Sequence, residues 1–126
     1  MEFNNQYLKY EEYLSLKGKL ERMPFNLLEF EARKRIDKHT FGRLKNLEEQ
    51  VDEVKLCVNA LINEISIYKS KGNIVSESAD GYSISYDQPL TVEQENKLYS
   101  LIKTYLSDCK LVDGTPYLFR GVWYVH

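Results

Sequence analysis

The stretch LEEQVDEVKLCVNALINEISIY, residues 47–68, has the clearest pattern in this 126-residue chain. Its apolar side chains recur at alternating spacings of four and three residues, which is the period of one face of an α-helix. Leu56, Ile62 and Ile67 lie off this face, so the helix needs cover on two sides. We therefore predict the central helix of a small bundle rather than an isolated coiled coil, which needs more heptads. The face comprises Leu47, Val51, Val54, Val58, Leu61, Ile65 and Tyr68.

Two helices are predicted before the central one. The first lies between Asn5, a candidate N-cap, and Gly18, which favours a helix end. The second has Pro24 at its first position and ends near residues 39–42. Each has apolar side chains at helical spacing, which are Tyr7, Tyr10, Tyr13 and Leu14 in the first helix and Phe25, Leu28, Ala32 and Ile36 in the second.

Capping pairs mark the starts of the third and fourth helices. Asn46 with Glu49 precedes the central helix, and Thr91 with Gln94 precedes the fourth. The fourth helical pattern stops after Asp108. Its apolar face comprises Leu98, Leu101, Ile102, Tyr105 and Leu106.

Two segments depart from the helical pattern. In VSESADGYSISY, serine alternates with tyrosine and isoleucine, and Asp80-Gly81 suits a tight turn, so a β-hairpin is predicted at about residues 74–86. Residues 109–126 are rich in aromatic side chains and are predicted to form an extended tail. The predicted fold class is mainly α, a single domain with about four helices between residues 5 and 108, the inserted hairpin and the tail.

Composition narrows the classes of function. Seventeen basic and nineteen acidic side chains give a net charge of −2, without the basic field that favours tight nonspecific DNA binding. No apolar run approaches a membrane span, so we expect no membrane association, and the first residues do not resemble a signal peptide. Cys57 and Cys109 have no paired spacing, which favours reduced thiols over a disulfide framework or a zinc site.

Motifs for catalysis are also missing from the sequence. The two histidines, His39 and His126, lie in a helix end and at the last position, where neither is a good candidate for a general base. Neighbouring carboxylates such as Glu48 and Glu49 point in different directions on a helix and do not converge on a metal. We expect no catalytic residues, no cofactor and no metal site, and therefore no enzyme.

Mixed charge on the second helix suggests contact with another subunit. Its basic residues are interleaved with acidic ones, which suits ion pairing to a copy of the same chain better than a phosphate track, although an exposed helix without a partner remains the alternative. The aromatic tail is likewise either folded onto its own core or a partner site. The residues expected at the subunit contact are Glu29, Arg33, Arg35, Asp37 and Lys38.

The order of these features resembles the head–tail connector, or head-completion adaptor, proteins of tailed bacteriophages and prophages of Gram-positive hosts. The resemblance rests on four segments in the same order, YEEYLSLKGK, FEARKRIDKHTFGRL, VSESADGYSISY and DGTPYLFRGVW, which together span most of the chain. It implies a structural virion protein that is assembled in the host cytoplasm and lies in the neck of the particle.

Such proteins form a ring, here expected to have twelve copies, beneath the portal protein. The ring extends the DNA channel, through which DNA passes without specific binding, and it presents a platform for the next neck protein, the stopper. The resemblance places the polar face of the hairpin toward this channel and the tail on the portal. The channel-facing residues would be Ser76, Glu77, Ser78, Asp80, Ser83 and Ser85, and the docking residues Tyr117, Leu118, Phe119, Arg120 and Trp123.

Three other functions remain as alternatives. A small helical regulator that binds nucleic acid would show salt-dependent binding to a duplex. A stopper-type neck protein would share the partners of the connector. An enzyme whose site has no familiar motif is the third.

Overall fold

The computed structural model describes residues 5–45, 47–70 and 89–118 of the chain. Within these ranges the protein is mainly helical, as predicted, and has four α-helices. The predicted hairpin at about residues 74–86 lies outside the described residues. The helices are α1 (Tyr10–Ser15), α2 (Arg22–Thr40), α3 (Asp52–Ser70) and α4 (Val92–Leu106).

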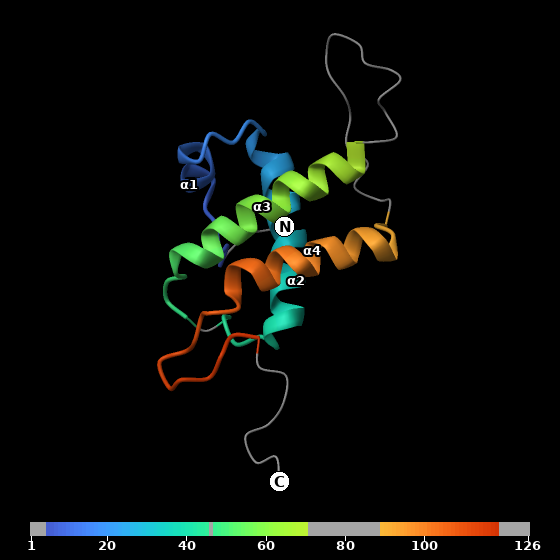
Figure 1. Cartoon of the computed structure of the whole chain (residues 1–126). Helices are drawn as coiled ribbons and strands as arrows, with labels where there is room; N and C mark the ends of the chain where they lie inside the picture. The colour runs from blue at the N-terminus through green and yellow to red at the C-terminus, as the bar shows by residue number, and fades with distance from the viewer. Residues whose placement is uncertain (1–4, 46, 71–88, 119–126) are drawn as a thin grey trace.

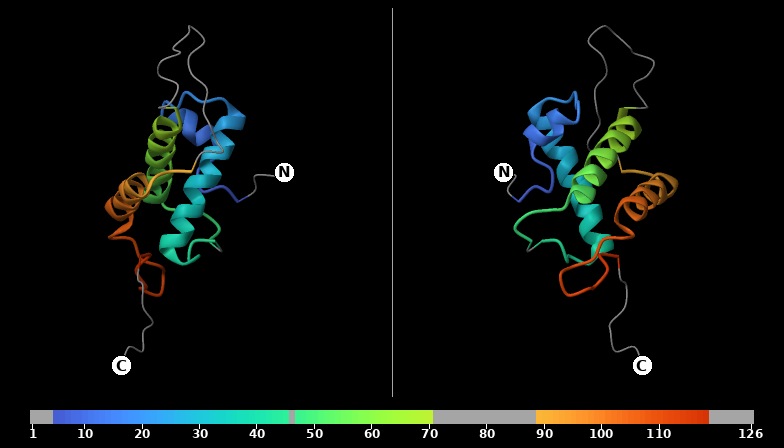
Figure 2. Two further views of the ribbon diagram at one scale, coloured as in Figure 1. Left: turned by 90° about the vertical axis from the view of Figure 1, so that its right-hand side faces the viewer. Right: turned by 60° about the vertical axis from the view of Figure 1, so that its left-hand side comes forward.

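Helix α3 is the centre of the bundle. It packs side by side with α4, and α2 crosses behind both of them (Figure 1). The short α1 contacts α2, and α3 lies between α1 and α4 in both views of Figure 2. This arrangement confirms the prediction of a central helix, because α3 has neighbours on more than one side.

The core forms along the predicted face of α3. Val54, Val58, Leu61 and Ile65 are fully buried, as the spacing predicts. The prediction was wrong for Val51, which is 41% exposed because α3 begins only at Asp52. Helix α2 contributes Phe25, Leu28, Ala32 and Ile36 to the same cluster, and α4 contributes Leu98, Ile102 and Leu106.

The second side of α3 is covered only in part. Ile62 and Cys57 are fully buried, whereas Leu56 is 42% exposed and Ile67 is 53% exposed. Part of the apolar surface of α3 therefore faces outward from the part of the bundle that the structure describes.

Local capping signals gave mixed results. The box at the start of α4 is confirmed, since the Thr91 hydroxyl accepts from the Gln94 N–H at 3.1 Å and the Gln94 side chain accepts from the Thr91 N–H at 2.9 Å. Asn5 does not cap α1, because the helix begins at Tyr10 and Asn5 has a φ of +59°. Helix α2 begins at Arg22, so Pro24 is its third residue rather than its first.

The start of the predicted tail folds back onto the bundle. The Asp113 carboxylate accepts from the Thr115 N–H at 2.9 Å, and Gly114 adopts a φ of +92°, so the chain turns sharply here. The Tyr117 N–H then donates to the Cys109 carbonyl at 2.9 Å, and the Tyr117 ring is only 3% exposed. Residues 109–117 of the predicted tail therefore pack on the bundle, and residues 119–126 of it lie outside the described residues. Among the described residues no helix is both long and apolar enough to cross a bilayer.

Candidate interaction surfaces

The mixed-charge face of α2 holds the N-terminal segment of its own chain. The Glu29 carboxylate is fully buried, where it accepts from the Tyr7 N–H at 2.9 Å and pairs with the Arg33 guanidinium at 3.2 Å. Arg33 also donates to the Asn5 carbonyl at 3.3 Å, and the Tyr7 hydroxyl donates to the Asp37 carboxylate. Burial raises the pKa of Glu29 because desolvation of the carboxylate outweighs the nearby Arg33 charge.

Arg35 links α2 to α4. Its Nε and Nη2 atoms donate to the two Glu95 oxygens at 2.8 and 2.7 Å, a bidentate geometry that strengthens the pair. Arg35 also lies 3.5 Å from the Glu31 carboxylate. Hydrogen bonds from Arg35 hold the pKa of Glu95 below its ordinary value, and those same bonds raise the pKa of Arg35.

These contacts change the interpretation of the predicted subunit contact. Glu29 is corrected from a contact residue to a buried one, since its side chain cannot reach another subunit in this structure. Arg33, Arg35 and Asp37 have partners within the chain. Only Lys38 of the predicted set is exposed to solvent. The mixed charges of α2 therefore bind other segments of the same chain, namely the N-terminal segment and α4.

A groove between α2 and α4 combines cations with aromatic rings. Phe30, Lys34 and Lys38 follow one another at a spacing of four along α2, and Tyr99 faces them from α4. The His39 ring stacks on the Tyr99 ring with centroids 4.2 Å apart. We call this surface the basic groove, and the space that it encloses has a volume of about 560 Å³. It is lined by Phe30, Glu31, Lys34, Arg35, Lys38, His39, Glu95, Asn96 and Tyr99.

The rings of the basic groove lie beneath ammonium groups. The Lys34 Nζ atom is 5.5 Å from the centroid of Phe30, and the Lys103 Nζ atom is 5.0 Å from that of Tyr99. Cations at these distances are attracted to the ring faces. Lys34 and Lys103 are therefore held near the groove although both are exposed.

Phe41 extends the groove past the end of α2. A second hollow is lined by Lys38, His39, Phe41, Tyr99 and Leu118, so the two hollows share three residues. Phe41 is 54% exposed and has a left-handed φ of +57°. That conformation costs a side-chain-bearing residue about 1–2 kcal/mol, and glycine is the usual residue at a helix C-cap of this kind. An exposed aromatic residue in this conformation makes this end of α2 a candidate interaction surface.

An acidic turn lies before and within the first turn of α3. We define it as residues 48–53, in which Glu48, Glu49, Asp52 and Glu53 are all exposed. Val51 lies among these carboxylates and is itself 41% exposed. Figure 2 shows α4 on one side of the C-terminal half of α2 and the segment that leads into α3 on the other.

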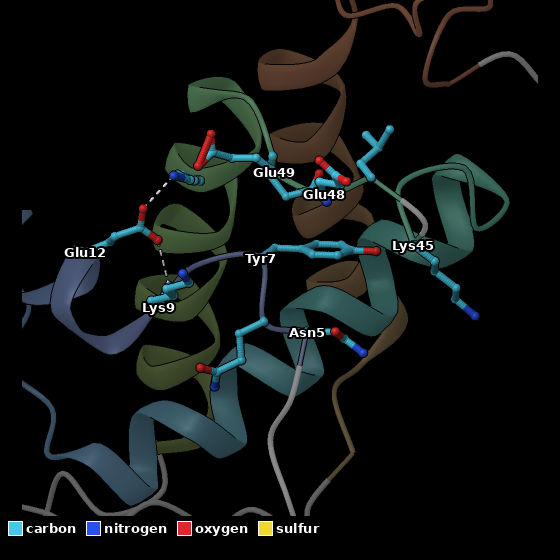
Figure 3. Close-up of a pocket in the computed structure, with 11 residues that line it drawn as sticks. Asn5, Tyr7, Lys9, Glu12, Lys45, Glu48 and Glu49 are labelled. Atoms are coloured by element: carbon cyan, nitrogen blue, oxygen red, sulfur yellow. Dashed lines mark hydrogen bonds and ion pairs between the residues drawn. The ribbon is translucent and has the colours of Figure 1, made fainter.

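The acidic turn borders a small polar pocket. Figure 3 shows Glu48 and Glu49 at this pocket together with Tyr7 and Lys45. The space measures about 130 Å³, which is below the usual size of about 300–1,000 Å³ for small-molecule sites. Glu12 pairs with Lys55 at its wall, so these two charges are already engaged with each other. The pocket is a poor candidate for substrate binding.

The predicted channel and docking residues are placed unevenly. Tyr117 belongs to the core, so its ring is not presented to a partner, and Leu118 is half-buried at the edge of the basic groove. The remaining residues of both predicted sets lie outside the described residues, namely Phe119, Arg120, Trp123, Ser76, Glu77, Ser78, Asp80, Ser83 and Ser85.

The thiols of the described residues are poorly suited to nucleophilic chemistry. Cys57 is fully buried, and burial raises its pKa to about 12. Burial also raises the pKa of Cys109. A reactive cysteine needs the opposite shift, since the thiolate is the nucleophile. No cluster of three metal-ligating side chains occurs among the described parts of the chain.

Comparisons of the chain with protein-family models, curated proteins and solved structures find no match. The basic groove was not predicted from the sequence, although the sequence shows Phe30, Lys34 and Lys38 at a spacing of four, which places them on one helix face. Tyr99 could not be joined to them because the two groups are separated by roughly sixty residues and meet only through packing of α4 on α2.

Proposed function

We propose that the chain is a structural virion protein that forms an adaptor ring beneath the portal of a tailed bacteriophage. The ring would contain twelve copies, extend the DNA channel and join the head to the stopper. The polar face of the hairpin segment would line the channel, and the segment beginning at Leu118 would reach the portal. The resemblance of four ordered sequence segments motivates this assignment.

One structural observation supports it most. Phe41 keeps an exposed ring in a strained conformation, beside Tyr99, His39 and the ammonium groups of the basic groove. Aromatic residues are enriched at protein–protein interfaces and among their binding hot spots. The described residues offer surfaces for assembly more readily than a site for chemistry, as a structural subunit requires.

The direct test is addition of the protein to its cognate portal. Negative-stain images of the mixture should show an extra ring along the portal axis, and the two proteins should sediment together. A small helical protein of similar charge is the control for nonspecific addition. Portal particles that look and sediment as they do alone would contradict the proposal.

A nucleic-acid-binding regulator is the second candidate, and the basic groove is the observation that favours it. Lys34, Lys38 and Lys103 are exposed near aromatic rings. Rings on which bases can stack, together with cations, attract single-stranded nucleic acid, and the cations alone attract a duplex. Binding to a duplex that weakens steeply with salt, together with no effect on the portal, would select this function instead.

A further inference from the structure

We propose that the basic groove of one copy binds the acidic turn of a second copy. This inference rests on the proposed ring function and identifies the contact between neighbouring subunits. The partner is a second copy of the same chain, because both halves of the contact are present on every copy.

The groove supplies cations around an apolar floor. Lys34 and Lys38 are exposed along α2, while Phe30 and Tyr99 provide ring surface between the two helices. The carboxylates of the groove, on Glu31 and Glu95, are both paired with Arg35. With Lys34, Arg35 and Lys38 set against these two carboxylates, the lining has a formal charge of +1, and its exposed cations are Lys34 and Lys38.

The acidic turn has the complementary arrangement. Glu48 and Glu49 lie on one side of Val51, and Asp52 and Glu53 lie on the other. Val51, the residue just before α3, is 41% exposed. An apolar side chain flanked by four carboxylates fits a floor of rings flanked by ammonium groups. The exposed apolar side chain among the charges distinguishes the turn from a general acidic surface.

The two surfaces also lie in suitable places on one molecule. The connection that carries the acidic turn and helix α4 lie on opposite sides of the C-terminal half of α2 (Figure 2). A copy can therefore use its groove for one neighbour and its turn for another. Contacts of this head-to-tail kind generate closed rings when the rotation between neighbours closes.

Nucleic acid is the less favoured occupant of the groove. The chain as a whole carries a net charge of −2, and the acidic turn adds four carboxylates to its surface. A phosphate backbone would be drawn to the groove but repelled by the remainder of the molecule.

The experiment uses two charge-reversed variants of the full chain. In Lys34→Glu/Lys38→Glu both surfaces are acidic, and in Glu48→Lys/Glu49→Lys/Glu53→Lys, which keeps only the Asp52 carboxylate in the turn, both are basic. Self-association is measured at low salt by sedimentation velocity and native mass spectrometry, with circular dichroism as the check on folding. Each variant alone should raise the dissociation constant about tenfold or more, whereas an equimolar mixture should assemble with alternating subunits. The control is Lys19→Glu/Lys97→Glu, which changes the net charge by the same amount as Lys34→Glu/Lys38→Glu but at exposed positions outside the groove. It should assemble like the unmodified chain.

Several results would overturn the contact. If the unmodified chain assembles and both variants assemble equally well, the contact is wrong although the ring function stands. If the mixture stays as dissociated as each variant, the two surfaces do not meet. If Lys34→Glu/Lys38→Glu loses duplex DNA binding but keeps self-association, the occupant is nucleic acid. A chain that stays monomeric at its highest soluble concentration and does not bind the portal contradicts the contact and the proposed function together, whereas a portal ring that forms normally from either variant contradicts the contact alone.

Discussion

Phe41 ends α2 with a φ of +57° and leaves its ring 54% exposed, although glycine is the residue that such a position favours. The Arg43 guanidinium lies 5.1 Å from its ring centroid and gives it some support. A residue that is strained and exposed contributes little to folding, which makes Phe41 a candidate for contact with a partner.

Phe41→Gly should therefore separate stability from assembly. Compared with Phe41→Ala, which lacks the ring but keeps a side chain at a positive φ, the glycine variant should be more stable by about 1 kcal/mol. Both variants should self-associate more weakly than the unmodified chain. Urea unfolding and sedimentation measure the two effects, and equal stability of the two variants would show that Phe41 is unstrained.

Leu61 offers the corresponding test of the core. Its side chain is fully buried on the central face of α3, so Leu61→Ala should lower the free energy of unfolding by about 2–5 kcal/mol. Leu56→Ala, on the exposed side of the same helix, should cost less than about 1 kcal/mol. Chemical denaturation of the two variants gives the comparison, and similar losses would mean that α3 is oriented differently.

At the scale of elements, helix existence followed from local sequence and helix boundaries did not. The start of α4 was predicted because Thr91 and Gln94 satisfy their own backbone neighbours. The start of α1 was missed because the helix begins only at Tyr10, whereas the Asn5 carbonyl accepts a hydrogen bond from Arg33 of α2. Glu29 was expected at the surface for the same reason, since sequence spacing does not reveal that the N-terminal segment covers it.

The link between α2 and α4 makes a prediction about pH. In a double-mutant cycle with Arg35→Ala and Glu95→Ala, the coupling free energy should be about 1 kcal/mol at neutral pH. Because the Arg35 hydrogen bonds lower the folded pKa of Glu95, the pair stabilises the protein above the ordinary value of 4.5 and loses this effect as pH falls through the lower folded pKa.

The exposed pair of Arg22 and Glu11, 3.8 Å apart, is a matched control. Its coupling should be near zero at every pH, since both side chains are well solvated. Unfolding of each variant in urea at neutral pH and at about pH 2 measures both cycles. A coupling for Arg35 and Glu95 that is unchanged in acid would mean that the carboxylate does not contribute through its charge.

At the scale of the whole molecule, one buried cluster connects all four helices. It includes Tyr13 from α1 and residues of α2, α3 and α4, and it also takes in Tyr7 and Tyr117 from outside the helices. A core that is shared in this way favours a single cooperative transition.

Far-ultraviolet circular dichroism, which reports the helices, and near-ultraviolet circular dichroism, which reports packed tyrosines, should therefore give one melting midpoint. The midpoint should also rise with protein concentration if copies associate, because association binds only the folded chain. Helical signal that persists after the tyrosine signal is lost would mean that helices remain after the core packing is lost, which contradicts a single transition.

The burial of Tyr117 has a consequence for how the protein is made. During translation the chain emerges from its N-terminus, and domains generally fold as units. Tyr7 and Leu8 leave the ribosome early, yet the cluster they join is complete only after Tyr117 has followed, more than a hundred residues later. Until then α3 lacks part of its cover, and nascent chains on neighbouring ribosomes expose apolar surface to one another. Slow translation over the last described residues should therefore increase demand for chaperones, whereas a released chain needs no further synthesis to close its core.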